Sequence, residues 1–375
     1  MNQDVDNFLS AVLRGDPADF SSLHNNDFQN KFLERASAHG VLAVLYHQWR
    51  QRDDWRHCPD SVGRILREAT YQQCHEQVLR QTELQFVFAS LAQEGIRALL
   101  MKGASLSFVL YPEPYLRPSI DTDLLIQASQ KEKMTRILRK AGYIASNQIS
   151  GNFVSYQDVF VKNIPDEAVH RLDIHTKISN PLLFSDLLTF EEIEKEAMPV
   201  PVFGPDVKTL CFEQALLLAC VHRVAHHQDN ERLIWLYDIH LLAEKVSVDQ
   251  MRSFARLAKE KKVAAICARG LWLSKQWFGT AVSQELCESL RVEAGEHEPS
   301  AAYLRIKHQR LLSEFILNWQ TLPTFEKKIR FLLECVFPSP DYMFKKYSTH
   351  LYLLLPFLYF FRLSSGFMKC LKRVR

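Results

Sequence analysis

Two aspartates one residue apart, Asp121 and Asp123, stand in the apolar run IDTDLLI at 120–126. The branched apolar flanks predict a β-strand, in which alternate side chains point to the same face. Two carboxylates held side by side repel each other, and a divalent cation such as Mg²⁺ relieves that repulsion. The pair therefore predicts a metal site, and the alternative is a solvated turn with two surface acids.

The segment just upstream has the features of a phosphate-binding turn. Residues 96–101 read as a short buried strand, residues 102–105 (Lys-Gly-Ala-Ser) as a tight turn, and residues 105–110 as the start of a helix. Free backbone N–H groups and the positive end of a helix dipole suit a triphosphate. In this reading Gly103 permits the turn, Lys102 adds a cation and Ser105 adds a hydroxyl.

Three further residues are candidates for the same site. Asp173, in the strand-like run RLDIH at 171–175, supplies a third carboxylate for a two-metal mechanism. His175 shares the face of Asp173 and is either a hydrogen-bond partner of a metal ligand or substrate, or a simple buried histidine. Arg117 next to Pro118 is either a phosphate ligand or a solvated loop arginine.

These segments resemble a known family, the bacterial uncharacterised nucleotidyltransferases of the DNA polymerase β-like superfamily. The resemblance extends over residues 30–245 and weakens after that. It departs from the wider superfamily at Ala104, where many members have Gly or Ser, and in the long stretch between the turn and Asp121. The motifs that carry the resemblance occur in the expected order: LLMKGAS, LYPEP, LRPSIDTDLLI, RLDIHTKI, LLLACVHRVAHH and RLIWLYDIHLL.

The resemblance implies Mg²⁺- or Mn²⁺-dependent transfer of a nucleoside monophosphate from an NTP to an acceptor. Extracellular polysaccharide or modified-peptide biosynthesis is the implied setting, with a sugar, lipid carrier, peptide or protein as acceptor. A different class of function is a degenerate transferase fold that binds nucleotide or peptide as a scaffold or regulator. The residues expected to bind metal and act in catalysis are Asp121, Asp123 and Asp173.

A second cluster of polar residues lies at His222, His226 and His227. His222 and His226 are four residues apart and share a helix face, a spacing that can bind a metal. Arg223 stands where a metallopeptidase helix needs Glu, so the hydrolytic zinc motif is absent. The residues alone favour histidines that bond to neighbouring groups, and the resemblance implies a helix lining the acceptor side, with His222 orienting substrate or acting as a base.

The composition is that of an α+β enzyme with several packed units. The chain has 375 residues, a net charge of +3 that does not indicate nucleic acid, and eight cysteines without a CxxC pair. With no secretory signal before Asp4, free thiols in the cytoplasm are expected. A small mixed β-sheet core flanked by helical regions is predicted, with an N-terminal helical region at 1–92, the core at 93–204 and a C-terminal helical region at 205–375.

The C-terminal segment raises a separate question. The apolar run LYLLLPFLYFF at 351–361 is too short to cross a bilayer, and Pro356 interrupts it. Residues 362–375 then carry five Lys or Arg and no acid, interleaved with apolar residues. This composition is typical of an interfacial helix attracted to anionic lipid, so peripheral contact of 351–375 with the inner membrane face is expected. The alternative is a docked helix with solvated charges.

Overall fold

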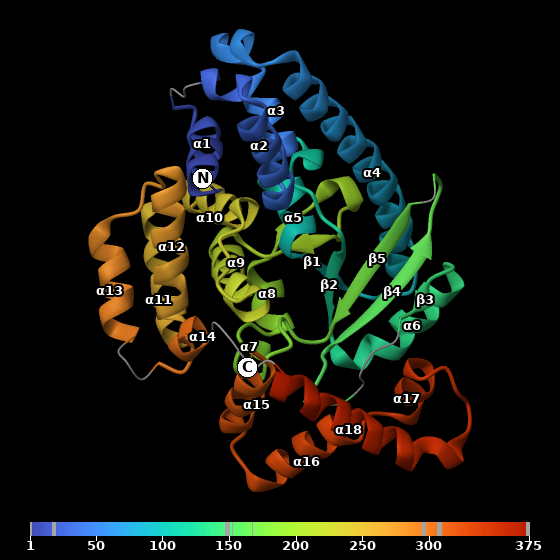
Figure 1. Ribbon diagram of the computed structural model, residues 1–375. Helices are drawn as coiled ribbons and strands as arrows, with labels where there is room; N and C mark the ends of the chain where they lie inside the picture. Colours follow the sequence, from blue (N-terminus) through green and yellow to red (C-terminus); the bar gives the residue numbers. More distant parts are fainter. Residues whose placement is uncertain are drawn as a thin grey trace.

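A seven-stranded mixed sheet lies between an N-terminal and a C-terminal set of helices (Figure 1). The computed structural model describes residues 2–16, 20–146, 151, 153–166, 168–294, 298–305 and 310–372. The predicted α+β class, with a small mixed sheet flanked by helical regions, is confirmed.

The N-terminal helices begin and end at recognisable local signals. The Asn25 side chain accepts hydrogen bonds from the backbone N–H groups of residues 27 and 28, and Gly40 ends the same helix with φ of +71°. The last of these helices is 34 residues long and runs along one side of the molecule (Figure 1). Their bounds are α1 Asn2–Arg14, α2 Asn26–His39, α3 Leu42–Trp49 and α4 Asp60–Gln93.

The sheet has the strand order β3-β4-β5-β2-β1-β7-β6. β1 and β2 are antiparallel, whereas β2 and β5 are parallel. β7 lies beyond residue 204, and the division of the chain at 92 and 204 stays a prediction. The strands are β1 Ala98–Met101, β2 Thr122–Ile126, β3 Ile144–Ala145, β4 Gln157–Asn163, β5 Val169–His175, β6 Met198–Pro199 and β7 Lys208–Thr209. The helices among them are α5 Lys102–Val109, α6 Lys131–Lys140, α7 Leu182–Ser185 and α8 Phe190–Glu196.

The two faces of the sheet are buried in different cores. Leu100, Leu124 and Ile174 pack with apolar residues of α4 and α6 in one core. Leu99 and Leu125 belong to the other core, which extends into the helices after the sheet. Because side chains alternate along a strand, Asp123 shares the face of Leu125, and this face carries the polar site described below.

The helices after the sheet form two groups. α9 to α14 pack together, and α15 to α18 lie below the sheet in the view of Figure 1. Their bounds are α9 Phe212–His227, α10 Leu233–Lys245, α11 Val248–Glu260, α12 Ala264–Phe278, α13 Gln284–Ala294, α14 Ala301–Arg305, α15 Arg310–Thr321, α16 Phe325–Val336, α17 Pro340–Lys346 and α18 Leu355–Lys372.

The C-terminal apolar run differs from its sequence-based description in one respect. Pro356 is the second residue of α18, so it lies in the first turn of a helix, where proline costs no hydrogen bond. It therefore does not interrupt a helix. Among the described helices, none combines the length and hydropathy needed to cross a membrane. Arg373 and Arg375, two of the expected tail cations, lie outside the described residues.

Candidate functional site

A cavity of about 790 Å³ opens over the polar face of the sheet. Its wall includes one turn-to-strand segment, two other strands, and helices α4, α5, α9 and α10. Most of the residues singled out in the sequence lie on this wall, and His175 lies beside it in contact with Asp123. The predicted residues on the wall are Lys102, Gly103, Ser105, Arg117, Asp121, Asp123, Asp173 and His222.

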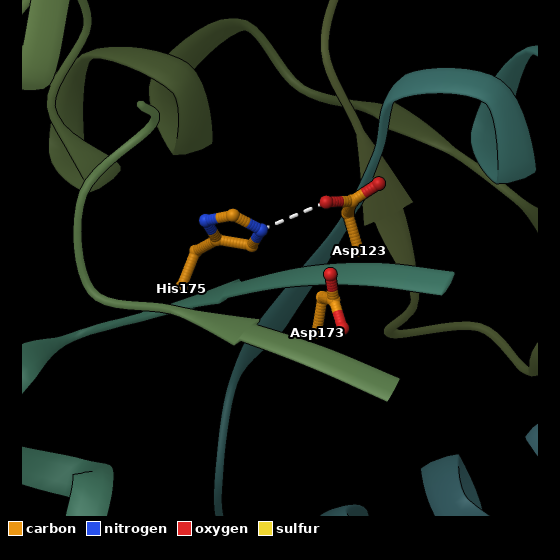
Figure 2. A group of neighbouring side chains, drawn as sticks. All are labelled: Asp123, Asp173 and His175. Carbon is orange, nitrogen blue, oxygen red and sulfur yellow. Dashed lines mark hydrogen bonds and ion pairs between the residues drawn. The ribbon is translucent and has the colours of Figure 1, made fainter. Parts of the chain in front are cut away.

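The strand register brings Asp123 and Asp173 together. In the parallel pairing of β2 and β5, Asp123 is the direct partner of Asp173, and Leu125 is the partner of His175. The ligand atoms of Asp123, Asp173 and His175 all lie within 4.8 Å of one another. Figure 2 shows the three side chains on the same side of the two strands. All three residues are buried, so the fold holds this group in place before any ligand binds.

Asp123 is held by two nitrogen atoms. Lys102 Nζ donates to Asp123 Oδ1 at 2.5 Å, and His175 Nε2 lies 2.7 Å from the same oxygen. Burial alone would raise the pKa of Asp123, but the Lys102 ammonium and the His175 bond hold this pKa well below its usual range. Asp123 is therefore ionised at every physiological pH. The carboxylate repulsion expected from the sequence is offset here by the Lys102 charge.

Asp173 has a different environment. Arg171 Nε donates to Asp173 Oδ1 at 3.1 Å, and the Gln157 side-chain amide donates to Asp173 Oδ2. Burial raises the pKa of Asp173 to about 6, with the Arg171 bond acting against it and the neighbouring negative charges adding to it. Sequence reasoning did not assign roles to Arg171 and Gln157. Arg171 is two residues before Asp173 and so shares its strand face, a signal that was available, whereas Gln157 reaches the site through the β4–β5 pairing.

Asp121 is placed differently from the sequence-based expectation. β2 begins at Thr122, so Asp121 precedes the strand and the two aspartates are not alternate residues of one strand. Asp121 lines the cavity but is outside the three-residue group of Asp123, Asp173 and His175. Burial, followed by the charge of Asp123, raises the pKa of Asp121. Its carboxylate therefore lies next to the group on the cavity wall, on a residue that precedes β2.

The expected turn at residues 102–105 is wrong, because α5 begins directly at Lys102. Lys102 has φ of +55°, an unusual value for a residue with a side chain. In this conformation the chain leaves β1 and enters α5 directly, without a separate loop. Ser105 is buried, and its hydroxyl donates to the Lys102 carbonyl at 2.9 Å. The first turn of α5 faces the cavity, with the Lys102 ammonium on Asp123.

Arg117 and Gly103 form a close contact. A Cβ atom on Gly103 would lie 2.6 Å from Arg117 Nη1, so only glycine leaves room for the guanidinium. Arg117 Nη2 donates to Asp238 Oδ2 at 2.7 Å, Arg117 Nε donates to both Asp238 oxygens, and the Tyr111 hydroxyl donates to Asp238 Oδ1. Asp238 belongs to α10, so this buried ion pair joins the sheet side of the cavity to its helical side.

The opposite wall consists of imidazole and aromatic rings from α9 and α10. His222 Nε2 and His227 Nε2 are 3.2 Å apart, and the Ser179 hydroxyl lies 2.8 Å from His226 Nε2. The His227 ring stacks on Trp235 with centroids 4.0 Å apart. His222 and His226 share a helix face as predicted, yet within the described residues α9 contributes no histidine to a three-ligand metal group.

Two histidines of this wall, His222 and His226, are uncharged at neutral pH. Burial, followed by the charge of Lys102, lowers the pKa of His226 to about 3 and holds the pKa of His222 well below its usual range. A neutral imidazole offers one donor and one acceptor. These two histidines can therefore orient a neutral polar group, and they add no positive charge of their own.

The donor set of the sheet wall fits a divalent cation. Carboxylate oxygens of Asp123 and Asp173 are the ligand type that Mg²⁺ and Mn²⁺ prefer, and Asp121 adds a third carboxylate on the same cavity. His175 already contacts Asp123, an arrangement that orients a ligating carboxylate from behind. The buried Asp-Asp-His group thus has the composition and spacing of a metal-binding group.

Comparison with known proteins identifies a family match. The model of the family described as "Uncharacterised nucleotidyltransferase" matches residues 26–279. No curated protein matches the chain. An antigenic nucleotidyltransferase-like protein from Paracoccidioides brasiliensis is 13% identical with a TM-score of 0.31, covering 50% of this chain and 92% of that one. JHP933 from Helicobacter pylori is 16% identical with a TM-score of 0.32, covering 67% of this chain and 95% of that one. Structural likeness this low carries no argument about the site.

Proposed function

Because the chain belongs to the family of uncharacterised nucleotidyltransferases, we propose that it transfers a nucleoside monophosphate from an NTP to an acceptor hydroxyl or phosphate. The single observation that carries the proposal is the group of Asp123, Asp173 and His175, with Asp121 on the same cavity. A protein that only bound a nucleotide would have no use for two buried carboxylates side by side with a third on the same cavity. The acceptor is a sugar, lipid carrier, peptide or protein, and the setting is polysaccharide or modified-peptide biosynthesis in the cytoplasm.

In this proposal Asp121, Asp123 and Asp173 hold the metal and His175 orients Asp123. A bound Mg²⁺ or Mn²⁺ supplies Lewis acidity toward the triphosphate and the attacking oxygen. The acceptor oxygen bonds to the α-phosphorus, the bond from that phosphorus to the bridging oxygen breaks, and pyrophosphate leaves. The proton of an acceptor hydroxyl passes to the Asp173 carboxylate, which lines the cavity.

The remaining residues bind the substrates. Lys102 moves its ammonium from Asp123 to the triphosphate when the metal takes over the carboxylate charge, because both partners of that ion pair face the cavity. Gly103 and Ser105 shape the first turn of α5 beneath the phosphates. Arg117, held by Asp238, adds positive charge next to Gly103. His222 orients the acceptor from the opposite wall.

The Lys102–Asp123 ion pair also favours a second candidate function. An ammonium 2.5 Å from the central carboxylate is what a degenerate site would use in place of a metal. In that case the protein is a scaffold or regulator that binds nucleotide or peptide and transfers nothing.

One experiment separates the two functions. The full-length protein is incubated with each α-labelled NTP, Mg²⁺ or Mn²⁺ and a lysate of the source cells, and labelled products are sought. A product that requires the metal and falls by about 100-fold or more in Asp123→Asn supports the transferase, because loss of a ligand exceeds the 10–100-fold cost of losing an outer partner. The matched control is Asp158→Asn, on β4, which is separated from β2 by β5; its carboxylate pairs with Lys131 and does not line the cavity.

Thermal shifts complete the test. Mg²⁺ with a non-hydrolysable NTP should raise the Tm of the wild type through preferential binding to the folded state. A shift without any labelled product favours the scaffold. The absence of both a shift and a product, with all four nucleotides, contradicts the transferase and a nucleotide-binding scaffold, and leaves only the peptide-binding scaffold.

We also propose that the segment 351–363 contacts an anionic membrane surface. Leu353, Phe357 and Phe360 are 89%, 73% and 75% exposed, far more than a docked helix would leave. Residues 342–375 contain seven Lys or Arg and neither Asp nor Glu. An exposed apolar face within a purely basic segment matches the headgroup region of an anionic bilayer.

Vesicle sedimentation tests this contact. Leu353→Glu with Phe360→Glu should reduce sedimentation with phosphatidylglycerol vesicles, and salt should weaken the binding of the wild type. Val292→Glu, at an exposed apolar position on α13, is the control. Equal sedimentation of all three proteins at low salt would rule out the contact.

A further inference from the structure

Arg232 differs from the other cations of the cavity in having no acidic partner. It is half-buried at the N-cap of α10 and lines the cavity. Over the residues that the structure describes, its side chain makes no hydrogen bond and no ion pair, and its Nε is buried without a partner. Its guanidinium lies over the Trp235 ring, whose centre is 5.3 Å from the guanidinium carbon.

The other lysines and arginines on the cavity wall are paired. Lys102 bonds to Asp123, Arg117 to Asp238 and Arg171 to Asp173. Arg80 and Arg223 pair with Glu76 and Asp229 at 2.6 and 2.5 Å. Arg232 is therefore the one cavity-lining Lys or Arg, among the described residues, whose charge faces the cavity without a carboxylate beside it.

Several features make this position unfavourable without a ligand. Burial of a charge costs free energy unless it is paired. Burial, followed by the charge of Arg117, lowers the pKa of Arg232, and the charge of Asp238, which is bonded to Arg117, acts against this shift. Arg232 Nη2 also lies close to Gly40, where a Cβ atom would come within 2.9 Å of it, so the guanidinium packs against backbone at this point. The fold thus maintains an unpaired guanidinium at this end of the cavity.

We propose that Arg232 is an anion-binding residue that receives a phosphate group of a bound substrate, next to the flat surface of Trp235 and His227. A guanidinium binds phosphate through two parallel hydrogen bonds, and its planar fork suits this better than an ammonium does. The contacts of His222 with His227, and of His227 with Trp235, connect this subsite to the carboxylate side of the cavity along one wall.

The phosphate has two sources, the tail of the donor NTP or a phosphate on the acceptor. The inference deepens the proposed transfer reaction, yet its test does not need that reaction. The first probe is inorganic tripolyphosphate without metal, which reports on Arg232 even if no NTP is ever turned over. The second is a non-hydrolysable NTP, and the third is inorganic phosphate added to the NTP-loaded protein.

Binding of these probes is measured for the full-length wild type, Arg232→Gln, Arg232→Lys and the control Arg252→Gln, which removes an exposed arginine of α11. A loss of about 10-fold or more in tripolyphosphate and NTP affinity in Arg232→Gln, with Arg232→Lys between it and the wild type, supports the donor phosphate. Unchanged NTP affinity with a similar loss for inorganic phosphate supports the acceptor phosphate. Affinities equal to the wild type for all three probes overturn the proposal.

Thermal stability excludes a purely structural role. Removal of an unpaired, half-buried charge should leave the Tm of Arg232→Gln equal to that of the wild type or raise it. A large fall in Tm would mean that Arg232 stabilises the fold through contacts of its own, and this also overturns the proposal.

Discussion

The two walls of the cavity balance their charges in opposite ways. On the sheet wall the charges of Asp123 and Asp173 are met by Lys102 and Arg171 in direct bonds. On the wall of α9 and α10, His222 and His226 are neutral and Arg232 has no acidic partner within the described chain. The sheet wall is a network of paired charges, whereas the helical wall holds one arginine whose charge is unpaired. The difference suggests that chemistry is organised on the strands and recognition on the helices.

The largest effect is expected from removing the Arg117–Asp238 ion pair, which joins the two walls. Asp238→Asn leaves the buried Arg117 guanidinium without its charge partner and the Tyr111 hydroxyl with a weaker acceptor. The expected loss in the free energy of unfolding is about 3–5 kcal/mol, the range for breaking a buried ion pair from one side. Turnover should fall as well, because the helical wall is no longer held against the sheet. Urea unfolding followed by circular dichroism measures the first effect.

The control for this change is a similar pair on the surface. Asp249 pairs with Arg252 at 2.8 Å, and both side chains are largely exposed. Asp249→Asn should change the unfolding free energy by less than about 1 kcal/mol. Adding Arg117→Gln to Asp238→Asn should cost less than the sum of the two single changes, because the pair acts as a unit. Strict additivity would mean that the pair does not connect the walls.

The sequence predicted more of the sheet wall than of this connection. The apolar runs at 96–101, 120–126 and 171–175 indicated strands, and the structure has strands at 98–101, 122–126 and 169–175. Alternation along β5 put Asp173 and His175 on one face, but it was the parallel register that set Asp123 beside Asp173. Hydrogen bonding between strands depends on the packing of the whole sheet, so a local pattern does not reveal it. Tertiary structure also decided that α5 starts at Lys102 without a turn.

The partner of Arg117 was beyond the reach of sequence reasoning. Asp238 is 121 residues away along the chain, and no local pattern connects the two. Spacing did place Arg117 before the strand that was predicted to bind metal, which suggested phosphate as its partner. Its guanidinium N–H groups already donate to the Asp238 carboxylate and the Pro118 carbonyl. The unpaired arginine of the cavity is Arg232, and a sequence shows which residues are charged but not which charges meet.

The walls should also respond to pH with opposite signs. In the metal-free protein the pKa of Asp173 is raised from 3.8 to about 6, so the folded state keeps a proton that the unfolded state releases, and stability falls as pH rises from about 4 to about 6. The pKa of His226 is lowered from 6.5 to about 3, so the unfolded state takes up a proton first, and stability falls as pH drops from 6.5 toward 3.

Two variants separate these effects. With EDTA present, Asp173→Asn should be more stable than the wild type at pH 7 by on the order of 3 kcal/mol and lose the advantage near pH 4. His226→Gln should show the reverse, with a higher unfolding free energy than the wild type below pH 5. The loss of the Ser179 hydrogen bond lowers the stability of this variant at every pH, so it is subtracted first. Urea unfolding at pH 4, 5.5 and 7 measures both. If the stability of the two variants relative to the wild type changed with pH in the same direction, the two walls would not respond to pH with opposite signs.

The smallest expected effect concerns Ser105, at the start of the helix that carries Lys102. Its hydroxyl hydrogen is committed to the Lys102 carbonyl at 2.9 Å, so while that bond lasts the hydroxyl cannot also donate to a phosphate. Ser105→Ala should cost about 1 kcal/mol of unfolding free energy, the typical value of one hydrogen bond. NTP affinity should change by less than about threefold, because 1.4 kcal/mol corresponds to tenfold and only the position of Lys102 is affected. A loss of NTP affinity beyond tenfold, at unchanged stability, would instead make Ser105 a direct phosphate ligand and add a recognition role to the sheet wall.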